Sequence, residues 1–120
     1  MKIYFAHATS GDYKNDFYAP LRKDGTLRQH ELILPHEDWK HENNSREFYD
    51  ELDVMIAEVS NPSTGMGIEL GWAYDAGVPI YAFCREGAKI SGAVYAVTEN
   101  MIKYTYSDDF VKKVNEAIIK

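Results

Sequence analysis

The sequence predicts an α/β domain in which helices cover both faces of a five-stranded parallel sheet. Three observations lead to this prediction. Short apolar, β-prone segments alternate along the chain with longer segments of helical periodicity. The segment from Val54 to Val59 is apolar almost throughout, as expected for a central strand buried on both faces. With 120 residues, 45% of them hydrophobic, and no repeat or linker, the chain is expected to form one domain, residues 1–120.

The N-terminal part is expected to contain two strands with a helix between them. Lys2 to Ala6 is short, apolar and β-prone, and it ends in a polar, glycine-containing turn. A helix can begin at Asp12, and Pro20 inside its pattern predicts a kink or a late start. The apolar face of this helix comprises Tyr13, Phe17 and Leu21. The second strand is Glu31 to Pro35, and residues 36–45 form a polar loop.

The middle of the chain is expected to run from a helix into the central strand and then into another helix. Asn44, with Glu47 three residues later, suits a helix start, and one face then carries Phe48 and Leu52. After the central strand and a loop over residues 61–65, helical spacing relates Leu70, Ala73, Tyr74 and Gly77. A Gly-x-Pro sequence then indicates that this helix stops.

The C-terminal part completes the alternation. The fourth strand is Pro79 to Cys84, a short helix follows near Ser91 to Val97, and Met101 to Thr105 is the fifth strand. Ser107 opens a last helix, whose apolar face is formed by Phe110, Val111, Val114, Ala117 and Ile118. This order predicts a doubly wound three-layer sandwich of the flavodoxin-like or Rossmann-like kind.

Ligands of doubly wound folds bind in the crevice beyond the carboxyl ends of the strands. In this chain the segments expected around that crevice are Ala6 to Gly11, Pro35 to Trp39, Ser60 to Glu69 and Arg85 to Ser91.

The composition excludes several classes of protein. The net charge of −6 argues against binding to nucleic acid polymers, which requires a basic face. Cys84 is the only cysteine, so no internal disulfide can form and a reducing compartment is expected. No apolar stretch approaches the ~20 residues of a membrane span, and the opening residues are too short and too polar a run for a signal sequence. We therefore expect a soluble, cytoplasmic protein without a membrane partner.

The segment most informative about function, Ala57 to Ala73, joins the central strand to the next helix. Gly65 and Gly67 allow backbone N–H groups to approach a ligand closely. Ser63 adds a hydroxyl at a helix N-terminus, a favourable place for a phosphate. Glu69 then falls in the first turns of the helix. Two plainer explanations stand beside this one: the helix dipole favours an acid there, and a tight turn with close helix–sheet packing also selects glycines.

This segment resembles the nucleoside 2-deoxyribosyltransferase superfamily, and most closely the 2'-deoxynucleoside 5'-phosphate N-hydrolases. Asp53 to Val59 and Pro62 to Gly71 match the family's signature nearly position by position, including Pro-Ser-x-Gly-x-Gly-x-Glu-Leu-Gly. Outside these residues the similarity holds in outline. The resemblance implies hydrolysis of the N-glycosidic bond of 2'-deoxynucleoside 5'-monophosphates, and no cofactor is expected.

The resemblance also implies roles for single residues. Glu69 matches the nucleophile, which attacks the anomeric carbon and forms a deoxyribosyl-enzyme ester. Tyr4 matches a first-strand tyrosine of the active site. Ser63 matches a serine that holds the 5'-phosphate, where true transferases have an aspartate. Ser91 resembles a serine that reaches the phosphate from the neighbouring subunit, which implies a homodimer.

Two features depart from the family pattern. An aspartate that assists catalysis is expected one helix upstream of the signature, and counting back places Ser45 there, with Glu42 and Glu47 out of register. The first loop lacks the family's phosphate-binding arginine, although His7 could supply a donor. The further substrate contacts expected in this loop are Ser10 and Gly11.

The remaining candidates carry weaker signals. His36 follows the second strand, where the family's base pocket begins, so it is either a substrate contact or a solvated loop residue. Trp39 could stack on a base or pin its loop to the domain. His36 and His41 are five residues apart, which does not fit a metal-binding helix face, and no metal site is expected. Glu58 lies in a buried strand and is interpreted as hydrogen-bonded structure.

Several functions follow as hypotheses. The first is hydrolysis of deoxynucleoside monophosphates. The second is transfer of deoxyribose between bases. The third is a nucleotide-binding module without turnover, suggested by Ser45 in place of the aspartate. A flavin carrier is a fourth, on the faint signal of Ala8 to Gly11 after the first strand.

Overall fold

A computed structural model describes residues 1–38 and 45–119. Its centre is a parallel five-stranded sheet of order β2-β1-β3-β4-β5. The strands are β1 (Lys2–His7), β2 (Glu31–Ile33), β3 (Val54–Glu58), β4 (Ile80–Arg85) and β5 (Met101–Tyr104). This is the order of doubly wound folds of the flavodoxin type, so the predicted fold class is confirmed.

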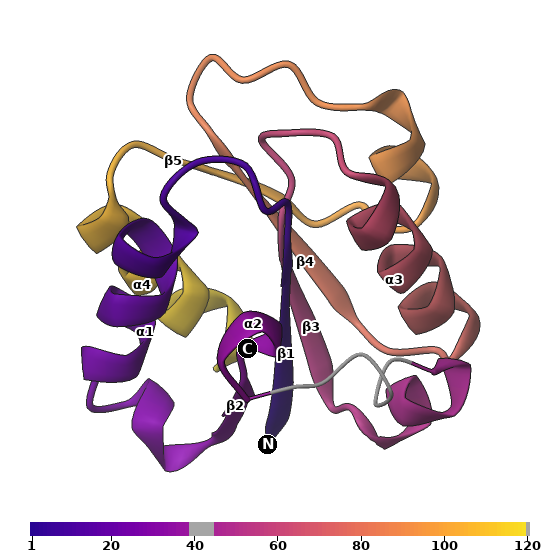
Figure 1. Ribbon diagram of the computed structural model, residues 1–120, viewed down its shortest axis with the longest axis horizontal. Coiled ribbons are helices and arrows are strands. Elements are labelled where there is room, and N and C mark those ends of the chain that lie inside the picture. The colour runs from indigo at the N-terminus through magenta and orange to yellow at the C-terminus, as the bar shows by residue number, and fades with distance from the viewer. Residues whose placement is uncertain (39–44, 120) are drawn as a thin grey trace.

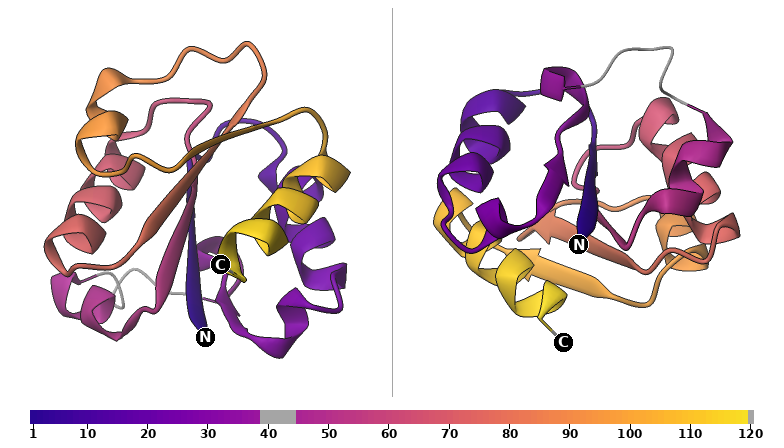
Figure 2. Two further views of the ribbon diagram at one scale, coloured as in Figure 1. Left: turned by 180° about the vertical axis from the view of Figure 1, so that it is seen from behind. Right: turned by 90° about the horizontal axis from the view of Figure 1, so that it is seen from below.

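Helical segments cover the sheet on both sides (Figure 1). One side carries η1 (Lys14–Tyr18), α1 (Ala19–Lys23) and α4 (Ser107–Ile118). The other carries η4 (Arg46–Glu51), α3 (Thr64–Asp75) and η5 (Gly92–Ala96). Two short segments flank β2, namely η2 (Leu27–Gln29) and α2 (Pro35–Asp38). The two views of Figure 2 show the sheet as the middle of three layers.

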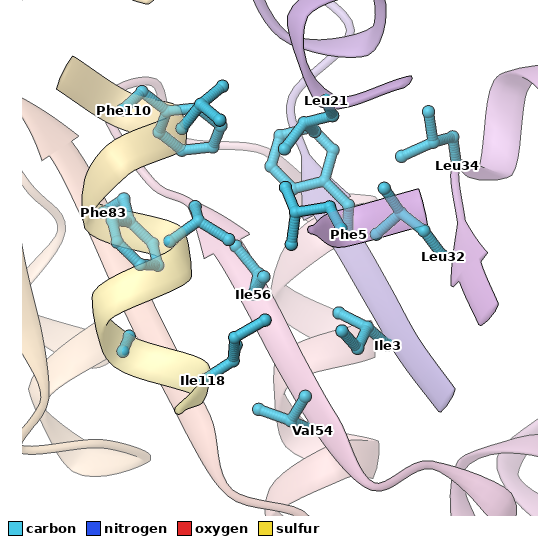
Figure 3. Packing of buried hydrophobic residues seen from close by; sticks show 14 of the residues in the cluster. Ile3, Phe5, Leu21, Leu32, Leu34, Val54, Ile56, Phe83, Phe110 and Ile118 are labelled. Carbon is cyan, nitrogen blue, oxygen red and sulfur yellow. The ribbon is translucent and has the colours of Figure 1, made fainter. Parts of the chain in front are cut away.

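Each face of the sheet has its own apolar core because successive strand residues point to opposite sides. Phe5 and Ile56 pack with Phe83 and Phe110 beneath α4 (Figure 3). Tyr4, one residue earlier on β1, belongs instead to the core beneath α3. The alternation along β1 therefore directs the candidate tyrosine toward the helix that carries Glu69.

The first helix combines two geometries. Residues Lys14–Tyr18 form a π-helix, and α1 continues from it without a break. Pro20 is the second residue of α1 and so lies inside this continuous helical stretch. The expected late start at this proline is wrong, because the helical stretch already begins at Lys14.

The segment between β2 and β3 contains two short helices, α2 and η4. Residues 35–38 form a short helix where a loop was expected, and Pro35, with its fixed φ, suits a first helical position. The expected helix start at Asn44 lies outside the described residues. The helix itself is present as the 3₁₀ helix η4, preceded by Ser45.

The second half of the chain agrees closely with expectation. α3 and α4 are regular twelve-residue helices, and Gly77 after α3 has φ +76°, a conformation that favours glycine. Across residues 1–38 and 45–119, no helix has the length and apolar character needed to cross a membrane.

Candidate active site

Glu69 lies in the second turn of α3, on the side of the helix that faces β1 and η4. Its Oε2 atom accepts a hydrogen bond from the Tyr4 hydroxyl and another, 3.3 Å long, from the Tyr49 hydroxyl. The side chain is neither fully buried nor fully exposed.

Burial and hydrogen bonding have opposite effects on the pKa of Glu69. Burial raises the pKa of its carboxyl, and the hydrogen bonds from Tyr4 and Tyr49 lower that pKa in part. Burial, followed by the Glu69 charge, raises the pKa of both tyrosine hydroxyls well above the ordinary range. Both hydroxyls therefore remain protonated and act as donors at any pH the protein meets.

Tyr49 was not singled out from the sequence. The expected α-helical face joined Phe48 to Leu52, whereas the 3₁₀ geometry of η4 puts Tyr49 and Leu52 on the inner face. Tyr49 is fully buried, and its ring meets the Tyr4 ring edge-on at 5.7 Å between centroids. A period of three in this segment is the signal that could have identified it.

Of the residues discussed for the upstream aspartate, Ser45 and Glu47 are described, and neither contributes a hydrogen bond to Glu69. Ser45 and Glu47 are exposed at the beginning of η4. Glu42 lies outside the described residues, as does Trp39, which was considered for stacking on a base.

Ser63 and Ser91 line the same cavity, of about 490 Å³, between α3 and η5. The Ser63 Oγ accepts a hydrogen bond from the Met66 N–H and so caps α3. The cavity is otherwise largely apolar, with Val59, Leu70 and Val94 among its walls. Since both serines belong to one chain, no second subunit is needed to bring them together; the homodimer stays a prediction.

Gly65 and Gly67 lie on the exposed side of the first turns of α3. A Cβ atom at either position would meet nothing within 4 Å. Close packing against the sheet therefore does not explain these glycines. Gly67 borders the cavity that Ser63 and Ser91 line, which leaves room for a ligand to approach the backbone.

His7 is buried at the end of β1, and both of its ring nitrogens are engaged within the protein. Nδ1 lies 2.7 Å from the Ala8 carbonyl, to which it must donate. Burial lowers the His7 pKa and so disfavours a second proton on the ring. With the proton on Nδ1, Nε2 accepts from the Tyr18 hydroxyl at 2.6 Å. Tyr18 in turn accepts from the His36 backbone N–H. In this arrangement His7 supports the loops and has no ring N–H left for a phosphate.

The other residues expected to contact the substrate in this region lie in the segments after β1 and β2. Ser10 and Gly11 are exposed in the loop after β1, with Gly11 at φ +79°. His36 is exposed on α2, and its ring lies 5.4 Å from that of His7. Burial is the main cause that raises the Tyr18 pKa, and the Glu69 charge adds a smaller contribution.

Two further residues are buried in the central strands, Glu58 in β3 and Cys84 in β4. The Glu58 carboxylate accepts hydrogen bonds from the Ser60 N–H, the Ser60 hydroxyl and the Tyr104 hydroxyl, which fits a structural role. Cys84 is buried in β4. Among residues 1–38 and 45–119, no group of His, Cys, Asp and Glu is arranged to hold a metal ion.

Comparison with known proteins identifies relatives in structure. No protein-family model and no curated protein sequence matches the chain. A CMP N-glycosidase from Clostridium botulinum is similar with TM-score 0.66 and 21% identity, over 96% of this chain and 99% of that chain. A conserved protein from Enterococcus faecalis V583 gives TM-score 0.68 and 16% identity, over 98% of each chain.

A 2-deoxyribosyltransferase from Bacillus psychrosaccharolyticus gives TM-score 0.60 and 20% identity, over 92% of this chain and 90% of that chain. At such identities the similarity shows a shared fold. An N-glycosidase and a deoxyribosyltransferase are thus among the structural neighbours, in agreement with the resemblance that the signature residues carry.

Proposed function

We propose that this protein is an N-glycosidase that releases the base from 2'-deoxynucleoside 5'-monophosphates, with Glu69 as its nucleophile. The observation that carries the proposal is the half-buried Glu69 carboxylate, held by two tyrosine hydroxyls on a single oxygen. A carboxylate removed from most of its water and fixed in direction is suited to nucleophilic attack. The shared fold with a CMP N-glycosidase supports the same class of reaction.

The reaction divides into two steps at the anomeric carbon. A Glu69 carboxylate oxygen attacks C1', and the C1'–N bond breaks as the base leaves with the bonding electron pair and takes a proton from solvent. The sugar phosphate is then held as an ester of Glu69. Water attacks C1', gives up a proton to solvent and regenerates the carboxylate. Without a 2'-hydroxyl, the oxocarbenium-like transition state is easier to reach.

Phosphate recognition is assigned to the N-terminal end of α3. Ser63 caps the helix, and Gly65 and Gly67 keep the adjacent surface free of side chains. Ser91 adds a second hydroxyl to the same cavity. We place the 5'-phosphate in this region, with Ser10, Gly11 and His36 bordering the crevice on the opposite side.

Base exchange is the second candidate, because a 2-deoxyribosyltransferase shares the fold. In that reaction a second base replaces water in the attack on the ester. A nucleotide-binding module without turnover is the third, motivated by the exposed Ser45 at the position of the expected aspartate.

The test is a chromatographic screen for free base after incubation with deoxyribonucleoside and ribonucleoside monophosphates and their unphosphorylated forms. We expect release from at least one deoxynucleoside monophosphate, and no release by Glu69→Ala under the same conditions. A new nucleotide formed only when free base is added would favour transfer. Thermal stabilisation by a nucleotide without any release, even at high protein concentration, would favour the binding module.

A further inference from the structure

The Tyr49 hydroxyl approaches Glu69 from a different element than Tyr4 does. Tyr4 belongs to β1 and Tyr49 to η4, yet both hydroxyls reach the Oε2 atom of Glu69. Edge-on packing of the two rings, with 65° between their planes, aims both at one point. The Trp72 ring, one turn after Glu69 on α3, packs against Tyr49 at 5.6 Å and limits its movement.

The two carboxylate oxygens of Glu69 consequently differ. Both hydrogen bonds end on Oε2, and Oε1 accepts none from residues 1–38 or 45–119. Two donors on one oxygen hold negative charge there and fix the plane of the carboxylate. The oxygen without donors is the better nucleophile, because attack from it requires no hydrogen bond to break.

We propose that Tyr49 is a positioning residue that works with Tyr4 to fix the Glu69 carboxylate and to present Oε1 to the sugar. This inference rests on the proposed function and deepens it. It also offers an answer to the missing upstream aspartate, since η4 supplies a tyrosine hydroxyl on Glu69 one turn beyond Ser45.

The same contact serves both halves of the reaction. In the first half, Oε1 forms the bond to C1', and Oε2 becomes the carbonyl oxygen of the ester. In the second half, water takes the sugar and the electron pair of the C1'–Oε1 bond returns to the carboxylate. Hydroxyls already placed on Oε2 stabilise the charge that develops there without having to reorganise.

The pKa of Glu69 depends on few groups. Within the described part of the chain, burial raises it and only Tyr4 and Tyr49 lower it. The other ionisable side chains on β1, η4, β3 and β4 do not contribute to the shift of the Glu69 pKa. They are Lys2, His7, Arg46, Glu47, Asp50, Glu51, Glu58, Tyr81, Cys84 and Arg85. Removing the Tyr49 hydroxyl should therefore move the Glu69 pKa upward.

The test compares Tyr49→Phe with wild type and with Tyr74→Phe, the same change at an exposed position of α3. The phenylalanine ring preserves the packing of Tyr49 and removes only its hydroxyl. We expect kcat to fall about tenfold with little change in KM, which corresponds to losing one hydrogen bond to a charged group. The acid limb of the kcat profile should move to higher pH. Tyr74→Phe should match wild type in both respects.

A second readout does not depend on turnover. Carbon NMR titration of the glutamate carboxyls, with Glu69 assigned by its absence in Glu69→Gln, should give a higher Glu69 pKa in Tyr49→Phe than in wild type and Tyr74→Phe. An unchanged titration in folded Tyr49→Phe would overturn the inference. If the titration shifts but wild type releases no base from any nucleotide, the positioning of Glu69 stands and the proposed reaction fails.

Discussion

The hydroxyl of Tyr4 donates a hydrogen bond to the carboxylate of Glu69, 65 residues further along the chain. Tyr4 is fully buried, and a buried tyrosine hydroxyl requires a partner. Here the partner is a carboxylate whose own pKa is raised by burial. Holding such a charge away from water lowers the stability of the fold, and arrangements of this kind are concentrated at functional sites.

Replacing Glu69 with glutamine should stabilise the fold in a pH-dependent manner. The pKa of Glu69 is raised in the folded protein, so the unfolded chain loses this proton first as the pH rises, and the fold loses stability between the two pKa values. Below both values the protonated carboxyl is present in both states. We expect Glu69→Gln to be more stable than wild type near pH 7, because glutamine carries no charge that burial opposes.

Urea unfolding at about pH 7 and about pH 4 measures this effect, since glutamate in an unfolded chain titrates near the lower value. The advantage of Glu69→Gln should shrink at the lower pH. An advantage of equal size at both would show that the carboxylate charge is not its cause.

Tyr4→Phe should lower kcat by about tenfold to a hundredfold while the protein remains folded, because it removes one of the two hydroxyls that donate to Glu69. The double variant Tyr4→Phe with Tyr49→Phe should change the activation free energy by an amount that differs from the sum of the two single changes, since both hydroxyls act on one oxygen. Kinetics of the four proteins give the coupling free energy. Simple additivity would indicate that the two hydroxyls act independently.

Ser63 should contribute to binding of the 5'-phosphate and separately to helix capping. Ser63→Ala is expected to raise KM for the nucleotide more than for the bare nucleoside, and to destabilise the protein by about 1 kcal/mol through loss of the cap on α3. Ser63→Asp keeps a capping oxygen but places a negative charge beside the phosphate. Ser63→Asp should keep the stability of wild type and still raise KM for the nucleotide more than for the nucleoside. Equal KM changes for both substrates would contradict the assignment of Ser63 to phosphate binding.

Glu58→Ala should destabilise the fold without a specific effect on catalysis. Its carboxylate is buried and accepts from Ser60 and Tyr104, so truncation leaves buried donors without their partner. We expect a loss of about 3 kcal/mol in the free energy of unfolding, measured with urea. Glu86→Ala, at an exposed position after β4, is the control and should change stability by less than about 0.5 kcal/mol.

Much of the fold could be predicted because its signals are local. The apolar segments of β1 and β3 reflect strands that are buried on both faces, and the amphipathic pattern of α4 reflects the one face that this helix buries. The short helices were harder. In η4 the 3₁₀ geometry changed which residues face inward, and at Pro35 a helical turn replaced a loop. A segment of one or two turns carries too few residues for its period to be recognised.

The candidate site divides in the same way. The strand, turn and helix N-terminus that follow one another along the chain made Glu69, Ser63 and the two glycines candidates, and the family resemblance supplied the roles predicted for Glu69 and Ser63. The partners of Glu69 are a different matter, since Tyr4 and Tyr49 reach it from separate elements.

His7 was expected as a phosphate donor, but the folded chain engages its ring nitrogens with Ala8 and Tyr18, and these partners could not be predicted from the sequence. The sequence by itself determined the fold class and the position of the carboxylate in the chain. Only the tertiary structure decided which hydroxyls hold that carboxylate, because hydrogen bonds between elements depend on how those elements pack.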